Sequence, residues 1–348
     1  MPVRTLKKVL ALARSDQEER GGSRSGGSAP TLNDIRRAAT RIAPYAFRTP
    51  ILTCSEVNRM CSAEIHFKCE NFQKVGAFKV RGAANAVFSL SEAEAERGVA
   101  THSSGNHAAA LAFAARQRRI PAHIVMPDNA PQAKKDNVAR YGARITFCEP
   151  TLQAREETLA RIVARTGAVV AHPYDDYRVI AGQGTCALEL LQDVPDLDIV
   201  MAPVGGGGLL AGTAIAVSEL SPETRVIAAE PANADDAARS FQAGHIIPSD
   251  NPQTVADGLL TSLGGRNFPI IMNRVFNILT VPEDAIIDAM RLIWERMKIV
   301  IEPSAAVPLA ALRLHRDEIL GQRIGIILSG GNVDLNRLPW MDRNTHAP

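Results

Sequence analysis

The chain carries little net charge, no paired-cysteine motif and no long apolar segment, and each absence excludes a class of protein. Its formal net charge is only +2 over 348 residues, and its basic residues form no long face, so no nucleic-acid partner is expected. No apolar run approaches the roughly 20 residues that a membrane-spanning helix needs. The sequence therefore predicts a protein without a membrane partner.

Cysteine is sparse and scattered along the chain. The five cysteines are odd in number and none forms a C-x-x-C pair, which argues against both a zinc site and a disulfide framework. Residues 1–14 are basic and amphipathic, but they lack the apolar core and cleavage site of a secretory signal. We therefore expect a cytoplasmic protein in a reducing compartment.

The composition is that of a globular protein large enough for two domains. Hydrophobic residues make up 46% of the chain and charged residues 22%, both ordinary values for a soluble protein. Residues 1–30 contain a run of glycine and serine, and we expect them to form a flexible extension. The folded body is expected to start with a helix that begins near Thr31.

Short apolar runs alternate with helix-like segments through the rest of the chain. This alternation predicts an α/β protein with mostly parallel sheets that helices cover on both faces. Ligands of such sheets bind at the carboxyl ends of the strands. The predicted strands span residues 64–69, 98–102, 122–126, 144–148, 169–172, 198–202, 225–230 and 324–328.

Polar or glycine-rich loops follow three of these predicted strands. A further stretch, Gly76–Ala83, places Lys79 directly after the aromatic Phe78 and between two glycines. A lone lysine in a helical opening is usually a solvated surface charge, so the other loops decide how it is interpreted. Those loops are Ser103–His107, Val204–Leu209 and Leu328–Asn332.

The four-glycine run Gly205–Gly208 lies between a predicted strand and a predicted helix. Without β-carbons, its backbone N–H groups can close around an anion at the helix N-terminus. A dinucleotide site is an alternative, since Gly205, Gly207 and Gly212 loosely fit G-x-G-x-x-G and Glu230 lies near the expected acidic position. A simple tight turn between strand and helix is the third interpretation.

Lys79 and the glycine run together favour a cofactor that bears both an aldehyde and a phosphate. A lysine amine forms an imine with an aldehyde, and pyridoxal 5′-phosphate carries both groups. Ser329 then has a role as well, because a hydroxyl beside the pyridine nitrogen leaves that nitrogen largely unprotonated. A weaker electron sink of this kind favours quick elimination over a long-lived carbanion.

The chain resembles the fold-type II pyridoxal-phosphate enzymes, and within them the serine/threonine dehydratase and serine racemase family. The resemblance covers roughly residues 31–340 and departs from the family at Ala77, where serine is usual. Several ordered motifs in one chain make a strong signal. They are Ala77–Ala83, Ser103–Ala108, Gly182–Thr185, Pro203–Leu209, Ala256–Leu259 and Ser329–Asn332.

The resemblance implies a role for each matched residue. Lys79 would form the imine and act as base on one face of the substrate α-carbon, and Phe78 would pack against the cofactor ring. Ser329 would face the ring nitrogen, and Gly205, Gly206, Gly207 and Gly208 would hold the phosphate. Asn106 would hydrogen-bond the ring hydroxyl. The substrate carboxylate would be bound by a loop that contains Ser103, Ser104, Asn106 and His107.

Two residues bear on the reaction and its substrate. Ser104 resembles the serine of the serine racemases and hydroxyaspartate dehydratases, and its hydroxyl could act on the α-carbon from the face opposite Lys79. The alternative is a loop serine that bonds its own backbone. Arg155 resembles a residue that meets an extra substrate carboxylate, and the alternative is a solvated helical arginine beside Glu156 and Glu157.

An acidic stretch after the predicted strand 225–230 resembles the divalent-cation site of serine racemase. Glu230, the Ala234 carbonyl and Asp236 would supply oxygen ligands to Mg²⁺, or to Ca²⁺ or Mn²⁺, with waters completing the shell. A generic acidic loop is the alternative.

We expect a large cofactor-binding domain made of residues 31–97 and 176–340, a small mobile domain made of residues 98–175, and a tail at residues 341–348. The family implies a homodimer.

The expected reaction is β-elimination, in which an ammonia-lyase converts serine, threonine or 3-hydroxyaspartate to a 2-oxo acid and ammonia. Serine racemisation through Lys79 and Ser104, alone or beside elimination, is the first alternative. β-Replacement, a nicotinamide-dependent dehydrogenase and a purely binding role are the others.

Overall fold

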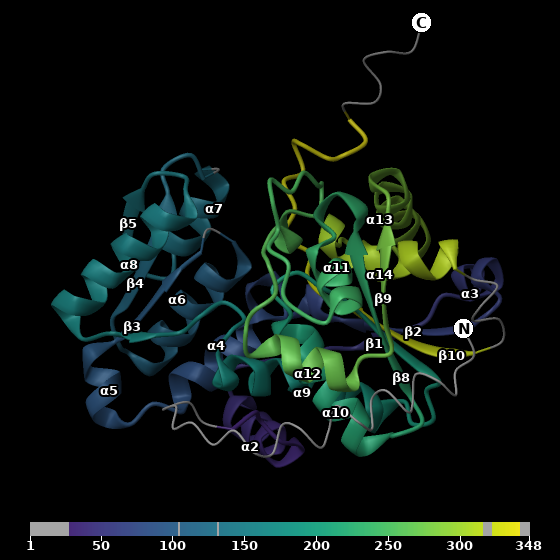
Figure 1. The fold of residues 1–348 in the computed structure, drawn as a ribbon, viewed down its shortest axis with the longest axis horizontal. Coiled ribbons are helices and arrows are strands. Elements are labelled where there is room, and N and C mark those ends of the chain that lie inside the picture. Colours follow the sequence, from purple (N-terminus) through teal and green to yellow (C-terminus); the bar gives the residue numbers. More distant parts are fainter. Residues whose placement is uncertain (1–27, 104, 131, 316–321, 342–348) are drawn as a thin grey trace, which may run out of the picture.

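The structure is a computed structural model that describes residues 28–103, 105–130, 132–315 and 322–341. Its strands form two separate sheets, one on each side of the molecule, with helices packed on their faces (Figure 1). The predicted α/β architecture with mostly parallel sheets covered by helices is therefore confirmed. The expected N-terminal extension falls mostly outside the described residues, as do Ser104 and all but the first residue of the expected tail.

The larger sheet has six strands in the order β1-β2-β10-β7-β8-β9. All neighbouring strands run parallel except β1, which is antiparallel to β2. Their bounds are β1 (Ile51–Leu52), β2 (Glu64–Cys69), β7 (Ile199–Pro203), β8 (Arg225–Pro231), β9 (Asn277–Val281) and β10 (Arg323–Leu328).

The smaller sheet has four parallel strands in the order β5-β4-β3-β6. Their bounds are β3 (Val99–His102), β4 (Ala122–Pro127), β5 (Arg144–Cys148) and β6 (Val169–Val170). The whole sheet is thus built from one continuous stretch of chain. This arrangement is compatible with the predicted small domain, whose boundaries and mobility stay predictions.

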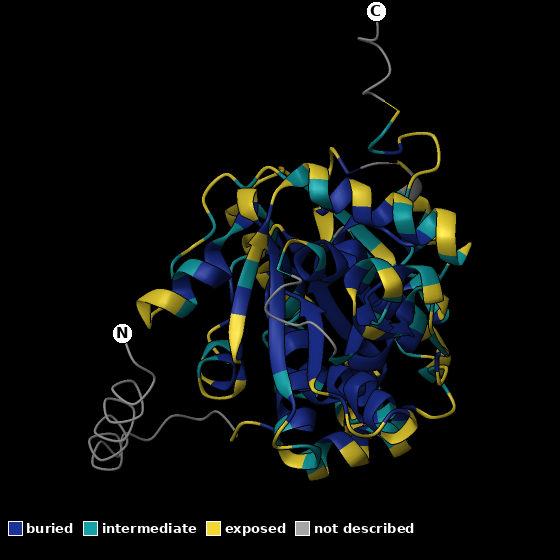
Figure 2. Cartoon of the chain, turned by 90° about the vertical axis from the view of Figure 1, so that its right-hand side faces the viewer, coloured by how far each residue is buried: buried dark blue, intermediate teal, exposed yellow. Residues whose placement is uncertain are grey.

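Helices connect the strands and cover both sheets. Figure 2 shows most strands buried in the interior and exposed residues mainly on the outer helix faces and loops, although β5 and β9 also carry exposed residues. The α-helices are α2 (Leu32–Ile42), α3 (Ser55–Cys61), α4 (Lys79–Phe88), α5 (Glu92–Arg97), α6 (Asn106–Arg118), α7 (Gln132–Ala139), α8 (Leu152–Thr166), α9 (Tyr177–Asp193), α10 (Gly208–Leu220), α11 (Asp236–Ala243), α12 (Asn267–Arg274), α13 (Glu283–Met297) and α14 (Pro303–Leu314). Short 3₁₀ turns are η1 (Glu70–Phe72), η2 (Lys74–Gly76), η3 (Ala232–Ala234) and η4 (Asp257–Leu259).

The fully apolar sequence of β7 follows from burial on both sheet faces. Successive side chains of a strand point to opposite faces. In β7, Ile199 and Met201 accordingly pack in the cluster formed with α13 and α14, whereas Val200 and Ala202 pack with α9 and α10. A strand with two buried faces has no polar side to present, so it reads as a continuous apolar run.

Helix α6 packs against α4, and this contact brings together the loops that precede the two helices. It is rich in alanine, a strong helix former, and most of its residues are buried against α4. Small side chains allow the two helices to approach closely. Because Asn106 begins α6 and Lys79 begins α4, this packing fixes the two residues relative to each other.

Two glycines in the interior of α9 mark close helix crossings. A β-carbon on Gly182 would lie 2.5 Å from the Arg81 carbonyl oxygen of α4, and one on Gly184 would lie 2.8 Å from the Gly212 carbonyl oxygen of α10. From sequence alone the start of this helix is uncertain, because glycine is a poor helix former. The crossings explain both glycines, since neighbouring backbones occupy the space of a side chain.

The predicted strands are confirmed, with small shifts at their ends. Only Val169–Val170 of the predicted strand 169–172 is paired. Strands β1 and β9 were not predicted. Among the described residues, no helix combines the length and apolar character needed to cross a membrane.

Candidate active site

Lys79 is held in place by the loop that follows the central strand β10. The N–H of Phe78 donates a hydrogen bond to the Ser329 carbonyl oxygen at 3.0 Å, and Ala77 forms an isolated antiparallel bridge with Gly330. Ser329 itself is buried. The structure thus brings together two predicted site stretches that lie near opposite ends of the chain.

The Lys79 amine is half-buried and held by few polar partners. Its Nζ donates to the Pro173 carbonyl oxygen at 3.0 Å and lies 5.0 Å from the centroid of the Phe78 ring. Burial lowers the pKa of Lys79 to about 8, an effect that the negative charge of Glu302 partly opposes. An amine with such a pKa is unprotonated and nucleophilic far more often at neutral pH than a surface lysine.

The glycine run forms a buried turn between β7 and α10. Gly207 has φ +90° and precedes the first residue of the helix, where no side chain caps the N-terminus. A β-carbon on Gly206 would lie 2.2 Å from the Tyr174 ring, and one on Gly205 would lie 2.9 Å from Leu259 Cα. The run therefore has to be glycine, because the surrounding residues leave no room for side chains.

Asn267 fixes the glycine run against the tyrosine that covers it. Its Nδ2 donates to the Gly206 carbonyl oxygen at 2.7 Å and to the Tyr174 carbonyl oxygen at 3.1 Å, and the residue is fully buried. The first N–H groups of a helix have no partner within that helix. At the start of α10 no side chain caps these groups and glycines precede them, which is the arrangement that binds phosphate in many proteins.

The site therefore fits a cofactor with an aldehyde and a phosphate. A reactive amine lies at the start of α4, and a glycine run whose backbone carries no side chains, and has no room for any, lies at the start of α10. Gly205, Gly206, Gly207 and Gly208 would hold the phosphate, and Lys79 would bind the aldehyde. Phe78 precedes Lys79 in the chain, and Ser329 is bonded to Phe78 through the backbone.

Asn106 belongs to a polar cluster that the sequence predicted only in part. Its Nδ2 donates to both carboxyl oxygens of Glu302, at 3.0 and 3.1 Å, and its Oδ1 accepts from Asn332 Nδ2 at 2.9 Å. Asn332 also donates to the Val75 carbonyl oxygen at 2.7 Å. Sequence reasoning missed Glu302 as a site residue.

The predicted carboxylate loop contains Ser103 and His107. Ser103 Oγ accepts from the Gly105 N–H at 3.3 Å, so this serine bonds its own loop. His107 is buried and its Nε2–H donates to the Ala171 carbonyl oxygen at 3.0 Å. Burial lowers the pKa of His107 to about 3, so the imidazole is neutral. Ser104 lies outside the described residues.

Arg155 is half-buried in the first turn of α8 and makes no ion pair with any described residue. Its Nε donates to the Thr151 carbonyl oxygen at 3.3 Å. Its positive charge reaches His102, whose pKa is lowered first by burial and then by Arg155. Burial raises the pKa of Tyr174, and the Arg155 charge slightly opposes this rise. Arg155 thus lies within electrostatic reach of both His102 and Tyr174.

A cleft of about 300 Å³ is lined by residues that include His102, His172 and Glu156, the neighbour of Arg155 in the chain. The rings of His102 and His172 meet edge to face at 5.8 Å between centroids, and His172 meets Tyr174 at 4.6 Å. His172 Nδ1 accepts from the Asp175 N–H at 2.9 Å, which leaves its Nε2–H as a donor.

Glu230 and Asp236 are both fully buried. The two oxygens of Glu230 accept from the N–H groups of Ala237 and Ala238 at 3.1 and 2.9 Å, so it caps α11. Asp236 Oδ2 accepts from the Leu263 N–H at 3.2 Å, and its Oδ1 has no described partner. Burial raises the pKa of Glu230 to about 9 and that of Asp236 to about 6.

These carboxyls partly fit the predicted cation site. Oδ1 of Asp236 has no hydrogen-bond partner among the described residues, and Ala234, two positions earlier in the chain, is also buried. Among the described residues, however, no group of three or more histidine, cysteine, aspartate or glutamate side chains could hold a metal. A cation here would need backbone oxygen and water as further ligands.

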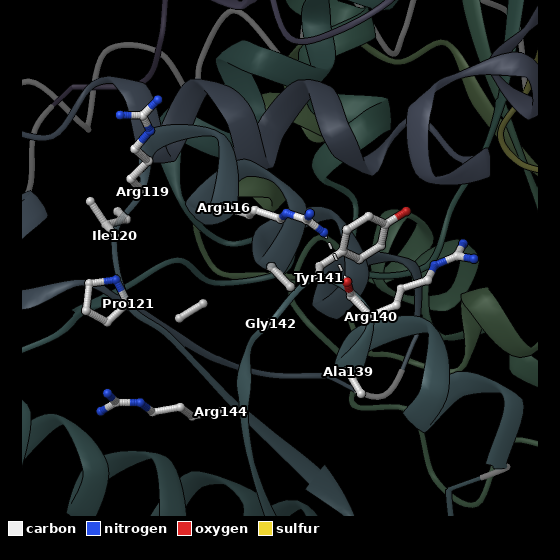
Figure 3. Close-up of a pocket in the computed structure, with 11 residues that line it drawn as sticks. Arg116, Arg119, Ile120, Pro121, Ala139, Arg140, Tyr141, Gly142 and Arg144 are labelled. Carbon is white, nitrogen blue, oxygen red and sulfur yellow. Dashed lines mark hydrogen bonds between the residues drawn. The ribbon is translucent and has the colours of Figure 1, made fainter.

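A second cleft, of about 460 Å³, lies at the other end of α6 from Asn106. Figure 3 shows Arg116, Arg119, Arg140 and Arg144 around it, and Arg116 donates to the Arg140 carbonyl oxygen at 3.1 Å. A helix rises about 1.5 Å per residue, so part of α6 separates this cleft from Asn106 and the Ser103 loop. It contains none of the predicted site residues.

Comparison with known proteins agrees with this geometry. The family described as "Pyridoxal-phosphate dependent enzyme" matches residues 42–330. The beta-hydroxyaspartate dehydratase of Paracoccus denitrificans (strain Pd 1222) is 56% identical over 311 residues, which cover 89% of this chain and 99% of that protein.

Three solved structures have the same fold. Serine racemase from Dictyostelium discoideum is 48% identical with a TM-score of 0.85, and the match covers 88% of this chain and 100% of that one. Maize serine racemase is 44% identical with a TM-score of 0.87, and the match covers 92% of this chain and 98% of that one. A threonine deaminase structure is 45% identical with a TM-score of 0.84, and the match covers 88% of this chain and 99% of that one. The chain therefore belongs to the pyridoxal-phosphate dependent enzymes, in the family that contains serine and threonine dehydratases and serine racemases.

Proposed function

We propose that the protein is an ammonia-lyase that converts a β-hydroxy-α-amino acid to a 2-oxo acid and ammonia by β-elimination. The observation that carries the proposal is the half-buried Lys79 amine, whose pKa is lowered to about 8. The loop after β10 holds this lysine in place, and the same chain contains a glycine run suited to the phosphate of a cofactor. When bound, pyridoxal phosphate supplies an electron sink for the bonds at the substrate α-carbon.

The residues of the chain supply position and proton transfer. Lys79 takes the α-proton, since its amine has a lowered pKa and contacts Pro173, whose neighbour Tyr174 covers the glycine run. The loop that contains Ser103 and His107 receives the substrate carboxylate at the N-terminus of α6, where backbone N–H groups favour an anion. The half-buried Tyr174 covers the glycine run and shields it from water.

The substrate we favour is 3-hydroxyaspartate. Its second carboxylate needs a cation, and Arg155 is a half-buried guanidinium without an ion-pair partner among the described residues. His102, whose pKa the Arg155 charge helps to lower, and His172, whose ring meets that of His102, offer further N–H donors. The relative from Paracoccus denitrificans that is named beta-hydroxyaspartate dehydratase supports the same choice. Serine and threonine lack this carboxylate and would leave Arg155 unused.

A substrate panel tests the proposal. Purified protein with pyridoxal phosphate would be given L-serine, D-serine, L-threonine and the threo and erythro forms of 3-hydroxyaspartate, and oxo acid, ammonia and substrate enantiomer would be followed together. We expect oxo acid and ammonia in equal amounts, fastest with a 3-hydroxyaspartate isomer. Neither product from any substrate would reject the ammonia-lyase and return attention to β-replacement.

Serine racemisation is the second candidate, because relatives named serine racemase are 44–48% identical to the chain. It would use Lys79 on one face of the α-carbon and Ser104 on the other. Ser104→Ala should then abolish inversion of serine while elimination continues. Inversion that survives in Ser104→Ala would remove the serine from this role.

We further propose that Glu230, the Ala234 carbonyl and Asp236 bind Mg²⁺ or a similar cation. Two buried carboxyls repel each other when ionised, and the unpartnered Asp236 Oδ1 is available as a ligand. Mg²⁺ should raise the melting temperature of the wild-type protein and leave that of Asp236→Asn unchanged. An equal rise in both proteins would place the cation elsewhere.

We also propose the homodimer, the cytoplasmic location and the mobile small domain of residues 98–175. Sedimentation of the purified protein tests the first, because a dimer has twice the 37.4 kDa mass of the chain. A monomer at all accessible concentrations would reject it.

A further inference from the structure

Glu302 is a carboxyl group inside the site to which the proposed elimination gives no role. It precedes α14, and only 4% of the residue is exposed. Both of its oxygens accept a hydrogen bond from Asn106 Nδ2. A β-carbon on Gly330 would lie 2.7 Å from Oε1, so this glycine leaves room for the carboxylate. Glu302 is therefore buried in direct contact with Asn106 and packed against Gly330.

The charges that face Glu302 come from three elements. Lys79 lies on α4, Lys134 on α7 and Asp257 on η4, and the last two form an ion pair with each other. Glu302 itself makes no ion pair with a described residue. A buried carboxylate without a paired cation is costly, and burial raises the pKa of Glu302 to about 7.

The position of Glu302 joins the two parts of the site. Its backbone N–H donates to the Gly330 carbonyl oxygen at 3.0 Å, which ties it to the loop that also holds Phe78 and Lys79. Its side chain reaches Asn106 at the start of α6, on the side of the smaller sheet. One carboxyl group therefore contacts the asparagine assigned to the cofactor ring, and its charge favours the protonated form of the lysine assigned to the aldehyde.

We propose that Glu302 is a positioning residue of this active site, which fixes the amide of Asn106 and supplies the negative charge that balances the Lys79 ammonium. The proposal rests on the assignment of Lys79 as the cofactor-binding lysine, and it does not depend on which amino acid is the substrate. Removal of the charge makes the Lys79 amine lose its proton at lower pH. Removal of the whole side chain also frees Asn106.

Two variants separate these effects. Glu302→Gln keeps the size and one oxygen acceptor for Asn106 but removes the charge, whereas Glu302→Ala removes both. Each would be prepared free of cofactor, and the rate and affinity of pyridoxal phosphate attachment to Lys79 would be followed by absorbance across pH. Glu283→Gln, which alters a half-buried carboxylate that bonds Thr254 and the Val255 N–H, serves as the matched control.

We expect the pH midpoint of attachment to fall by about one unit in both Glu302 variants, because an opposite charge nearby favours the ammonium. Only Glu302→Ala should lose affinity for the cofactor as well, by roughly tenfold. Glu283→Gln should match the wild type in both measurements.

Overlapping pH profiles of Glu302→Gln and wild type would overturn the charge role, and unchanged affinity in Glu302→Ala would overturn the positioning of Asn106. Thermal melting of each variant identifies any that fails to fold, and Glu302→Gln is the decisive one because it keeps the shape of the side chain. If attachment follows these expectations but no substrate is eliminated, the proposed reaction fails and the role of Glu302 stands.

Discussion

At the scale of single residues, burial controls which groups of the site are charged. It lowers the pKa of Lys79 to about 8 and that of His107 to about 3. For His107, the folded pKa lies below its ordinary value of 6.5. As the pH falls from about 6.5 towards 3, the unfolded chain binds a proton that the folded protein refuses, so His107 makes the folded state progressively less stable.

This effect predicts that His107→Gln lowers the pH dependence of stability in that window. Through this one group, the unfolding free energy of the wild type should fall by up to about 1.4 kcal/mol for each pH unit of acidification. In the variant this contribution is absent, so its unfolding free energy should fall less steeply by the same amount. Urea unfolding at two pH values between about 5 and 7 measures the difference. His245→Gln, at an exposed loop histidine, is the control, and equal slopes in wild type and His107→Gln would contradict the assignment.

At the scale of elements, the N-terminus of α10 depends on glycines that its neighbours require. A β-carbon on Gly206 would come 2.2 Å from the Tyr174 ring, whereas Gly265 has nothing within 4 Å. Gly206→Ala should therefore displace Tyr174 and weaken pyridoxal phosphate binding by tenfold or more, about 1.4 kcal/mol. Absorbance titration of the cofactor-free protein measures this, with Gly265→Ala as control. Full affinity in Gly206→Ala would show that the cradle lies elsewhere.

At the scale of the whole molecule, a buried ionic network ties the larger sheet to the helix of Lys79. Arg81 of α4 donates hydrogen bonds of 2.7 and 2.8 Å to Glu70, which follows β2. It donates two more, of the same lengths, to Glu189 of α9. Lys68 of β2 also pairs with Glu189 at 2.7 Å. The network contains two cations and two carboxylates, so it is neutral as a unit.

Loss of Arg81 would leave the buried Glu70 without its cation. Arg81→Met should therefore destabilise the fold by about 3–5 kcal/mol, measured by denaturant unfolding. Arg291→Ala breaks an exposed pair with Glu295 and should cost less than about 1 kcal/mol. Similar losses in the two variants would mean that the network contributes no more than a surface ion pair.

The alternating architecture and the loops at the strand ends could be predicted from the sequence. A strand that is buried on both faces is recognisable from its own apolar sequence, without knowledge of its neighbours. The glycines of the proposed phosphate site are recognisable because they directly follow such a strand. Strands β1 and β9 escaped prediction because β1 is only two residues long and β9 is partly exposed. The pairing of a strand depends on partners distant in sequence.

The residues that sequence reasoning missed owe their roles to tertiary contacts. Glu302 stands before Pro303, which signals only a helix start, and its contact with Asn106 spans 196 positions. Asn267 and Tyr174 likewise meet the glycine run only in the folded chain. No local sequence pattern identifies such residues. The one available signal was that Glu302 follows an apolar stretch, which indicates that its side chain is buried.

The most direct test of the account is elimination from 3-hydroxyaspartate by wild type, Lys79→Ala and Arg155→Ala, each with pyridoxal phosphate. Oxo acid and ammonia would be measured together at several substrate concentrations. We expect the wild type to form both, Lys79→Ala to form neither, and Arg155→Ala to need a higher concentration of 3-hydroxyaspartate but not of serine. Undiminished elimination by Lys79→Ala would contradict the central claim.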